Sequence, residues 1–312
     1  MTKTKIILNI SGGKDSTALL LWAMERGIDF QPVYADTGNE HAATLEYVRD
    51  LPHRSGCPEI RWVRADFSDS FVGRRKRLPE KWRRDGVSEE RIQEALEALH
   101  PTGNPFLDLC ILKGRFPSTR ARFCSEELKH KAIHEEIILP WLDKGYETVS
   151  MLGIRADESR SRSRMLRLED LNNGRWVYRP ILNWNVDKVF AIHRRHGIEP
   201  NPLYRLGFAR VGCMPCIHEA KGGVRNISQR FPEHISRIAE WEMRVKAASK
   251  RFGATFFPAD KVPGPHQKDH SLPVPDVNEV VRWSMTAHGG YQFDLFAGEE
   301  PAVCSSQYGL CE

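Results

Sequence analysis

The stretch Ser11-Gly12-Gly13-Lys14-Asp15-Ser16 constrains the fold more than any other part of the sequence. It follows the apolar run 5–10 and precedes the periodic segment 17–26, a pattern that predicts a strand, a glycine turn and a helix. The two glycines let the backbone approach an anion closely, and the free N–H groups at the start of the helix point at that anion. The alternative interpretation is a plain strand-to-helix turn with a polar cap.

The polar side chains of this stretch each suggest a contact with a nucleotide. Lys14 can reach the outer phosphates as a point charge, and the hydroxyls of Ser11 and Ser16 can contact phosphate oxygens. Asp15 can hold a magnesium ion or cap the helix. The spacing excludes the common G-x-x-x-x-G-K-[ST] loop. The stretch resembles instead the signature loop of the N-type ATP pyrophosphatases, which cleave ATP between the α and β phosphates.

Composition and charge limit the class of protein. The chain has 312 residues, of which 40% are hydrophobic and 28% charged, as expected of a soluble globular protein with one large domain or two. It contains neither a membrane-length apolar run nor a signal peptide, so we expect a cytoplasmic protein without a membrane partner. The net charge of +5 is concentrated in basic runs at 74–84, 113–122 and 155–167. Such runs indicate either a solvated face or a polyanionic substrate.

A second strand is predicted at 29–35, and it ends in Asp36-Thr37-Gly38. In an open parallel sheet, ligands sit beyond the carboxyl ends of the strands, so this segment should face the loop at 11–16. Asp36 and Thr37 can then contact a nucleotide or its magnesium ion. The alternative is a simple turn, in which Asn39 or Glu40 starts a helix at 41–49.

The remaining elements are predicted from periodicity and from breaker residues. Further strands are expected at 58–65 and 148–154, with helices at 125–142, 186–196, 228–252 and 277–287. The basic segment 66–122 is expected to be a long insertion on the binding face, with one helical patch at 88–100. The predicted domains are a nucleotide-binding domain at 1–217 and a mainly helical region with a cysteine-containing tail at 218–312.

Two further motifs resemble the phosphoadenosine phosphosulfate reductase superfamily. They are the arginine–cysteine pair at 122–124 with the Leu-Lys pair that follows, and the G-x-R pattern that starts at Gly153. The resemblance implies an α/β, Rossmann-like (HUP-type) parallel sheet flanked by helices. Arg155 would contact phosphate, the alternative being a surface salt bridge. The implied nucleotide-binding set is Ser11, Gly12, Gly13, Lys14, Asp15, Ser16, Asp36, Thr37, Gly38, Gly153 and Arg155.

The seven cysteines suggest metal or redox chemistry rather than a disulfide scaffold. The turn in Cys213-x-x-Cys216 brings two sulfurs to the same side, where they can bind one metal centre. The resemblance adds Cys124 as a third ligand. The fourth ligand is Cys304 or Cys311, with Cys304 preferred.

A [4Fe-4S] cluster is the expected occupant of this site, with zinc as the alternative. In a rival zinc site, both tail cysteines join Cys213 and Cys216, and Cys124 becomes the residue that carries sulfur. Cys57 and Cys110 have no partner at ligand spacing, so we expect them to be buried as small hydrophobic residues.

The resemblance favours an ATP-dependent adenylating enzyme of the type that places sulfur on DNA or tRNA. Reductases of the superfamily generally lack the complete loop, whereas this chain retains Lys14 to bind the β and γ phosphates of ATP. Lys14, Asp15 and Cys311 are the catalytic candidates, and a cysteine desulfurase is a candidate sulfur donor. As a residue of an exposed loop, Lys14 should matter far more for turnover than for the fold.

Two alternatives remain open. The first is a phosphoadenosine- or adenosine-phosphosulfate reductase, whose mobile tail carries a nucleophilic cysteine close to Gly-Leu. Here Gly309-Leu310-Cys311 has these residues in a different order. The second is a metal-stabilised nucleic-acid-binding protein without catalysis, which would leave the 11–16 loop without a purpose.

Overall fold

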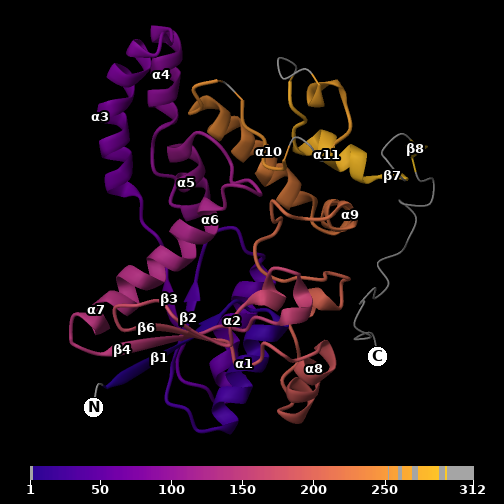
Figure 1. Cartoon of the computed structure of the whole chain (residues 1–312). Coiled ribbons are helices and arrows are strands. Elements are labelled where there is room, and N and C mark those ends of the chain that lie inside the picture. The colour runs from indigo at the N-terminus through magenta and orange to yellow at the C-terminus, as the bar shows by residue number, and fades with distance from the viewer. Residues whose placement is uncertain (1–2, 252, 259–261, 269–272, 288–291, 294–312) are drawn as a thin grey trace.

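The computed structural model describes residues 3–251, 253–258, 262–268, 273–287 and 292–293. Its centre is a six-stranded sheet with the strand order β3-β2-β1-β4-β6-β5, in which only the edge pair β5–β6 is antiparallel (Figure 1). The strands are β1 Thr4–Ile10, β2 Gln31–Ala35, β3 Arg61–Val63, β4 Glu147–Met151, β5 Leu168–Asp170 and β6 Arg175–Tyr178. This order confirms the predicted Rossmann-like sheet.

Helices cover both faces of the sheet because its strands carry apolar side chains on both sides. One face packs against α1 Lys14–Glu25, α2 Ala42–Ser55 and α8 Val186–Arg195. The opposite face packs against the irregular helix that begins with α6 Phe123–Ser125 and ends with α7 Leu139–Leu142. Between these two elements the chain forms π-helical turns at Glu126–Lys131 and His134–Ile138.

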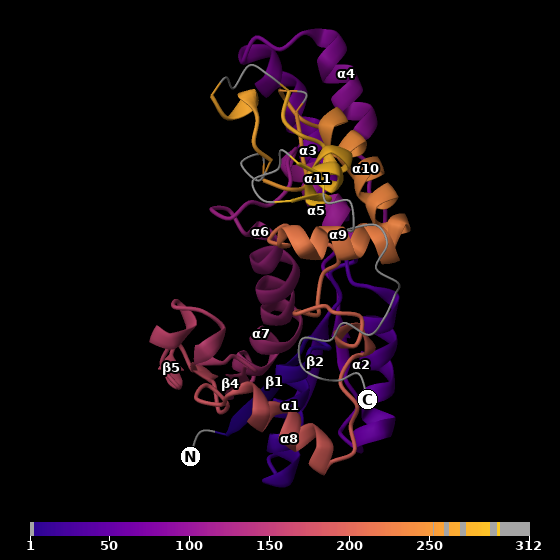
Figure 2. The ribbon, with the colours of Figure 1, turned by 90° about the vertical axis from the view of Figure 1, so that its right-hand side faces the viewer.

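The other helices form a second lobe beside the sheet (Figures 1 and 2). It contains α3 Ser68–Arg84, α4 Glu89–Ala98, α5 Pro105–Lys113, α9 Lys221–Arg230, α10 Pro232–Ala247 and α11 Val277–Ser284. These helices share one hydrophobic core, to which Trp82 from α3 and Trp241 from α10 both belong. The basic insertion and the C-terminal region therefore bury their apolar faces against each other. A small antiparallel pair, β7 Thr286–Ala287 and β8 Gln292–Phe293, follows α11.

The insertion is more ordered than the sequence indicated. Instead of one helical patch in a long loop, it forms the three helices α3, α4 and α5. The apolar side chains of Phe71, Leu78 and Trp82 lie at helical spacing and are at most 3% exposed. Because basic residues lie between these apolar ones, the sequence analysis did not detect their helical periodicity.

Two predicted helix boundaries are also wrong. The helix expected at 228–252 is two helices, because Pro232 lacks the N–H that would continue α9 and instead occupies the first turn of α10. The helix expected at 41–49 is capped by His41, whose ring accepts the N–H of Ala43, and it continues to Ser55 instead of ending at Arg49. Among the described residues, the helices are too short or too polar to cross a membrane.

Candidate active site

The 11–16 loop connects β1 to α1 and is braced by its own polar groups. The Ser16 hydroxyl donates to the carbonyl of Gly13 over 3.0 Å and accepts the N–H of Ser11 over 3.1 Å. Gly12 has a φ of +73°, and a Cβ at this position would lie 2.7 Å from Cγ2 of Thr44. Only glycine fits there without strain, so α2 holds the loop closely from one side.

Three buried side chains from residues 193–204 hold the loop from another side. Nε2 of His193 lies 2.8 Å from the carbonyl oxygen of Lys14, and the Asn201 amide donates to the carbonyl of Gly12 over 3.2 Å. The Tyr204 hydroxyl accepts the N–H of Lys14 over 3.0 Å. Burial lowers the pKa of His193. The sequence analysis missed all three residues, because no local pattern links them to a loop near the N-terminus.

The charged groups of the loop form a buried network. The Lys14 ammonium lies 2.9 Å from an Asp15 carboxylate oxygen, and its Nζ is 5.5 Å from the centre of the Tyr204 ring. Lys14 is only 5% exposed, so the expectation of an exposed lysine is wrong. The tyrosine ring and the ion pair cover its stem and charge.

Arg155 belongs to the same network. Its Nε donates to the other oxygen of Asp15 over 2.6 Å, and its Nη1 lies 2.5 Å from Asp157. Arg155 is 5% exposed, so it forms these ion pairs as a buried side chain, and its contact with phosphate stays a prediction. Burial alone lowers the pKa of Arg155, but the two carboxylates outweigh this effect and raise it. The segment after β4 is therefore fixed to the loop by charge.

The contact between that segment and the loop also depends on Gly153. A Cβ at this position would lie 2.8 Å from the carbonyl oxygen of Asp15 and 2.9 Å from Cα of Ser16. A larger residue would push the two segments apart. The structure thus brings Gly153 and Arg155 to the loop, as the resemblance implied.

The segment Asp36-Thr37-Gly38 follows β2 and lies beside β3 and the cysteine-containing region. The Asp36 carboxylate accepts the N–H of Gly38 over 2.9 Å and pairs with Arg64 over 3.2 Å. The Thr37 hydroxyl donates to Glu40 over 2.6 Å. Asp15 and Asp36 are both engaged with cationic side chains here, and their role as magnesium ligands stays a prediction.

Three cysteines converge near this segment. Cys213 Sγ lies 3.8 Å from a Glu40 carboxylate oxygen, and desolvation raises the pKa of Cys213 to about 12. Lys129 interacts electrostatically with all three thiols, those of Cys124, Cys213 and Cys216. Its pKa is raised by Cys213 first, and also by Glu40, Cys124 and Cys216. A cation is thus already placed among the thiols, where it would stabilise negative charge. Neither Glu40 nor Lys129 was selected as a site residue from the sequence.

The metal site remains a prediction. Among the described residues, no three His, Cys, Asp or Glu side chains are placed so that they could hold a metal ion. Cys304 and Cys311 lie outside the described residues. Three thiols are nevertheless the donor chemistry that zinc and iron–sulfur centres use. Cys57 and Cys110 are 7% and 0% exposed, which confirms their predicted burial.

We expect Cys124→Ser, Cys213→Ser and Cys216→Ser each to reduce the bound metal strongly, because an incomplete thiolate shell binds metal weakly. Iron, zinc and acid-labile sulfide assays on protein purified without oxygen measure this loss. Cys57→Ser and Cys110→Ser are the matched controls and should retain full metal.

The tail cysteines distinguish the two ligand sets. Loss of metal in Cys304→Ser but not in Cys311→Ser would identify Cys304 as the fourth ligand. Loss in both tail variants with retention in Cys124→Ser would favour the rival zinc site. Full metal in all five variants at positions 124, 213, 216, 304 and 311 would refute a cysteine-ligated centre.

The strand order and the glycine loop after β1 define a Rossmann-like nucleotide-binding protein of the HUP type. The chain belongs to the phosphoadenosine phosphosulfate reductase domain family, whose sequence profile matches residues 5–219. This range includes the 11–16 loop, Arg155 and the Cys213–Cys216 pair.

Individual proteins are also similar to this chain. An uncharacterized 37.8 kDa protein of Escherichia phage 186 is 48% identical, over 98% of this chain and 96% of that protein. The adenosine 5'-phosphosulfate reductase of Allochromatium vinosum is 35% identical over 65 residues, which are 20% of this chain and 25% of that one. The solved phosphoadenylyl-sulfate reductase of Candida auris covers 67% of this chain and 81% of its own, with 14% identity and a TM-score of 0.40.

Proposed function

We propose that this chain is an enzyme of the nucleotide α-hydrolase superfamily that binds Mg-ATP on the 11–16 loop and splits it into AMP and pyrophosphate. The observation that carries the proposal is Lys14. Its ammonium is fixed by Asp15 and Tyr204 at the start of α1, where it can neutralise the outer phosphates of ATP. A reductase that acts on an already activated sulfate has no pyrophosphate to neutralise.

In the proposed reaction, an oxygen of the acceptor attacks the α phosphorus of ATP. The bond from that phosphorus to the bridging oxygen of the β phosphate breaks, and pyrophosphate leaves with the electron pair. Lys14 stabilises the charge that develops on the leaving group, and the N–H groups at the start of α1 contribute their partial positive charge. Magnesium, held by Asp15 or Asp36, would screen the phosphates while the acceptor approaches.

The second half of the proposed function is sulfur transfer to nucleic acid, with DNA or tRNA as the acceptor. Hydrosulfide attacks the acceptor atom that carries the adenylated oxygen, the bond to that oxygen breaks, and AMP leaves with the electron pair. A cysteine desulfurase is the candidate donor, and a thiol reductant supplies the two electrons that release hydrosulfide from its persulfide. The thiols of Cys124, Cys213 and Cys216 lie together beside the Asp36 segment. This grouping supports either sulfur transfer or an iron–sulfur cluster at this position. Cys311 is the candidate for carrying sulfur, but it lies outside the described residues.

The second candidate function is reduction of phosphoadenosine or adenosine phosphosulfate. The family match and the similarity to adenosine 5'-phosphosulfate reductases favour it. A nucleic-acid-binding protein without catalysis is the third candidate, and the buried charge network around the loop argues against it.

Product analysis tests these alternatives directly. We expect the anaerobically purified protein to convert ATP into AMP and pyrophosphate when an acceptor nucleic acid is present. Chromatography of radiolabelled nucleotide, with a coupled pyrophosphate assay, detects both products. Release of ADP and orthophosphate would refute the proposal. Sulfite release from adenosine phosphosulfate, with ATP left intact, would establish the reductase instead.

A further inference from the structure

A polar cavity of about 610 Å³ lies between α3, α5 and the π-helical turns of residues 126–138. It is separate from the 11–16 loop, and Arg64, which lines the cavity, pairs with Asp36 of the segment after β2. Basic side chains enter the cavity from three sides. They are Arg64 from the loop after β3, Arg74 and Arg77 from α3, Lys113 from α5 and Lys131 from the π-helical turns.

Two of the four acidic side chains that line the cavity, Glu127 and Glu135, are paired with its lysines. Glu127 lies 3.1 Å from Lys113 and 3.7 Å from Lys131, and Glu135 lies 3.9 Å from Lys131. Asp66 accepts the N–H and the hydroxyl of Ser68. Glu136, the fourth acid of the lining, is exposed. The ion pairs of Glu127 and Glu135 thus go to Lys113 and Lys131 and not to the arginines of α3.

Arg74 and Arg77 are the arginines that α3 contributes to the cavity. Nε of Arg74 is buried without a hydrogen-bond acceptor among the described residues. Both arginines line the same cavity, and burial first and the charge of Arg77 second lower the pKa of Arg74. An anion between them would remove their repulsion and supply the missing acceptor.

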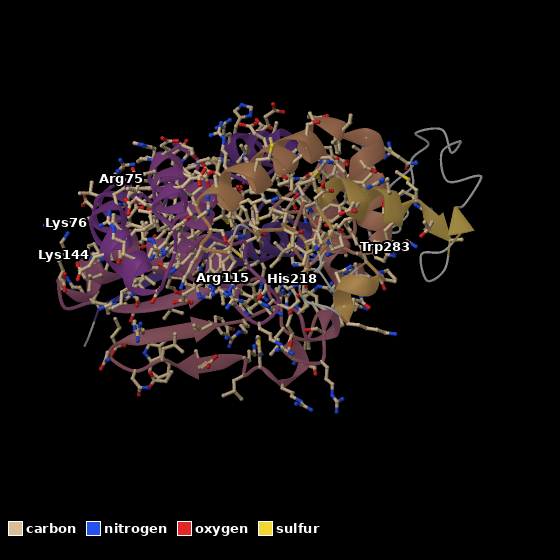
Figure 3. All side chains as sticks on the ribbon, turned by 90° about the horizontal axis from the view of Figure 1, so that it is seen from above. Arg75, Lys76, Arg115, Lys144, His218 and Trp283 are labelled. Carbon is tan, nitrogen blue, oxygen red and sulfur yellow. The ribbon has the colours of Figure 1, made fainter. Side chains whose placement is uncertain are left out.

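The positive charge continues along α3. Arg74, Arg77, Lys81 and Arg84 follow one another at intervals of three and four residues, so they form a stripe on one side of the helix, about 15 Å long. The neighbouring basic residues differ in role. Arg75 donates to the carbonyls of Leu96 and Leu99 and so ties α3 to α4. Figure 3 shows Arg75 and Lys76 at the outer edge of the molecule, on the side opposite Trp283.

We propose that the cavity and the α3 stripe form a phosphate-binding site for the phosphodiester backbone of a nucleic acid. A single phosphate would need only the cavity, whereas the stripe is long enough to meet successive phosphates of one strand. Arginine suits this role because its planar fork binds phosphate oxygens in pairs. The inference rests on the proposed function for the identity of the acceptor, and it places that acceptor beside the Asp36 segment.

The test is the salt dependence of nucleic-acid binding by the full chain without ATP, measured as fluorescence anisotropy of labelled DNA and RNA duplexes. The slope of log K against log salt is negative, and each lost phosphate contact lowers its magnitude by about 0.9 on duplex DNA, so the double variant Arg74→Gln/Arg77→Gln should lower that magnitude by about 1.8. If glutamine at position 74 prevents folding, the single variant Arg77→Gln takes the place of the double variant. It changes an exposed residue and should lower the magnitude of the slope by about 0.9.

The double variant Lys188→Gln/Arg194→Gln is the matched control. It removes the same charge from exposed positions on α8, which lies at the opposite end of the molecule from α3 in both views (Figures 1 and 2). Its slope should equal that of the wild type. An unchanged slope in the α3 variants, or binding to neither duplex, would overturn the inference.

Binding of inorganic phosphate, measured at constant ionic strength, distinguishes a free-anion site from a nucleic-acid site. Binding of inorganic phosphate that depends on Arg77, without binding of either duplex, would identify a free-anion site and overturn the nucleic-acid assignment. Failure to release pyrophosphate would refute the proposed function but leave the binding result intact, so the two failures are distinguishable.

Discussion

We expect the substitution Lys14→Met to lower kcat for ATP cleavage by about 10²–10³-fold, the usual effect of removing one group that stabilises charge in the transition state. Methionine keeps most of the length of the buried lysine stem, which packs beside Tyr204, but it removes the ammonium. Asp15 keeps its ion pair with Arg155, so no buried carboxylate is left without a partner. Pyrophosphate release measures kcat, and a circular dichroism melt checks the fold.

Lys188→Met is the control for this experiment. It makes the same change at an exposed position on α8 and should leave both kcat and the melting temperature at the wild-type values. Wild-type turnover in a well-folded Lys14→Met protein would contradict the role of Lys14 in ATP cleavage. Because the lysine is buried, alanine is a poorer test than methionine, since it would leave a cavity beside the loop.

The largest effect on stability is expected from Glu242→Ala. The Glu242 carboxylate is 6% exposed and accepts the backbone N–H of Phe256 over 2.7 Å and that of Val277 over 3.0 Å. Its removal leaves two buried donors without acceptors. The free energy of unfolding should fall by about 3 kcal/mol, because each unsatisfied donor costs about 1–3 kcal/mol. Urea denaturation followed by circular dichroism measures the change.

Glu240→Ala is the matched control, two residues earlier on α10. Glu240 is half exposed and pairs with Arg244 one turn away, so its loss should change stability by about 0.5 kcal/mol or less. Glu242→Gln keeps one side-chain oxygen and should fall between the two alanine variants. Equal stabilities of Glu240→Ala and Glu242→Ala would show that the buried carboxylate does not hold α10 and α11 together.

The parts of the site that the sequence predicted are those that depend on neighbouring residues. The glycines at 12 and 13 lie between a strand and a helix, and this local order was sufficient to place the loop. The Asp36 segment was predicted from the general geometry of parallel sheets. Gly153 and Arg155 came from the family resemblance, and the structure places both against the loop.

The missed residues act across long sequence separations. His193, Asn201 and Tyr204 reach the loop over 179, 189 and 190 residues, and no periodicity encodes such contacts. The burial of Lys14 was missed for the same reason, because Tyr204 covers its stem. In the insertion, the patch predicted at 88–100 corresponds to α4, whereas α3 and α5 were missed. In α3, basic residues alternate with a few large apolar ones, so its composition is that of a solvated segment.

The shared core of the helical lobe has a consequence for synthesis of the chain. Trp82 and Ile92 emerge from the ribosome long before α10, with which they share one hydrophobic core. Until then their apolar surfaces have no native cover, whereas the sheet strands β1 to β4 and their helices can already assemble. The family profile ends at residue 219, just before α9 begins at Lys221. The segment that the family profile matches is therefore shorter than the segment that must be translated before the insertion can bury its apolar surfaces against α10.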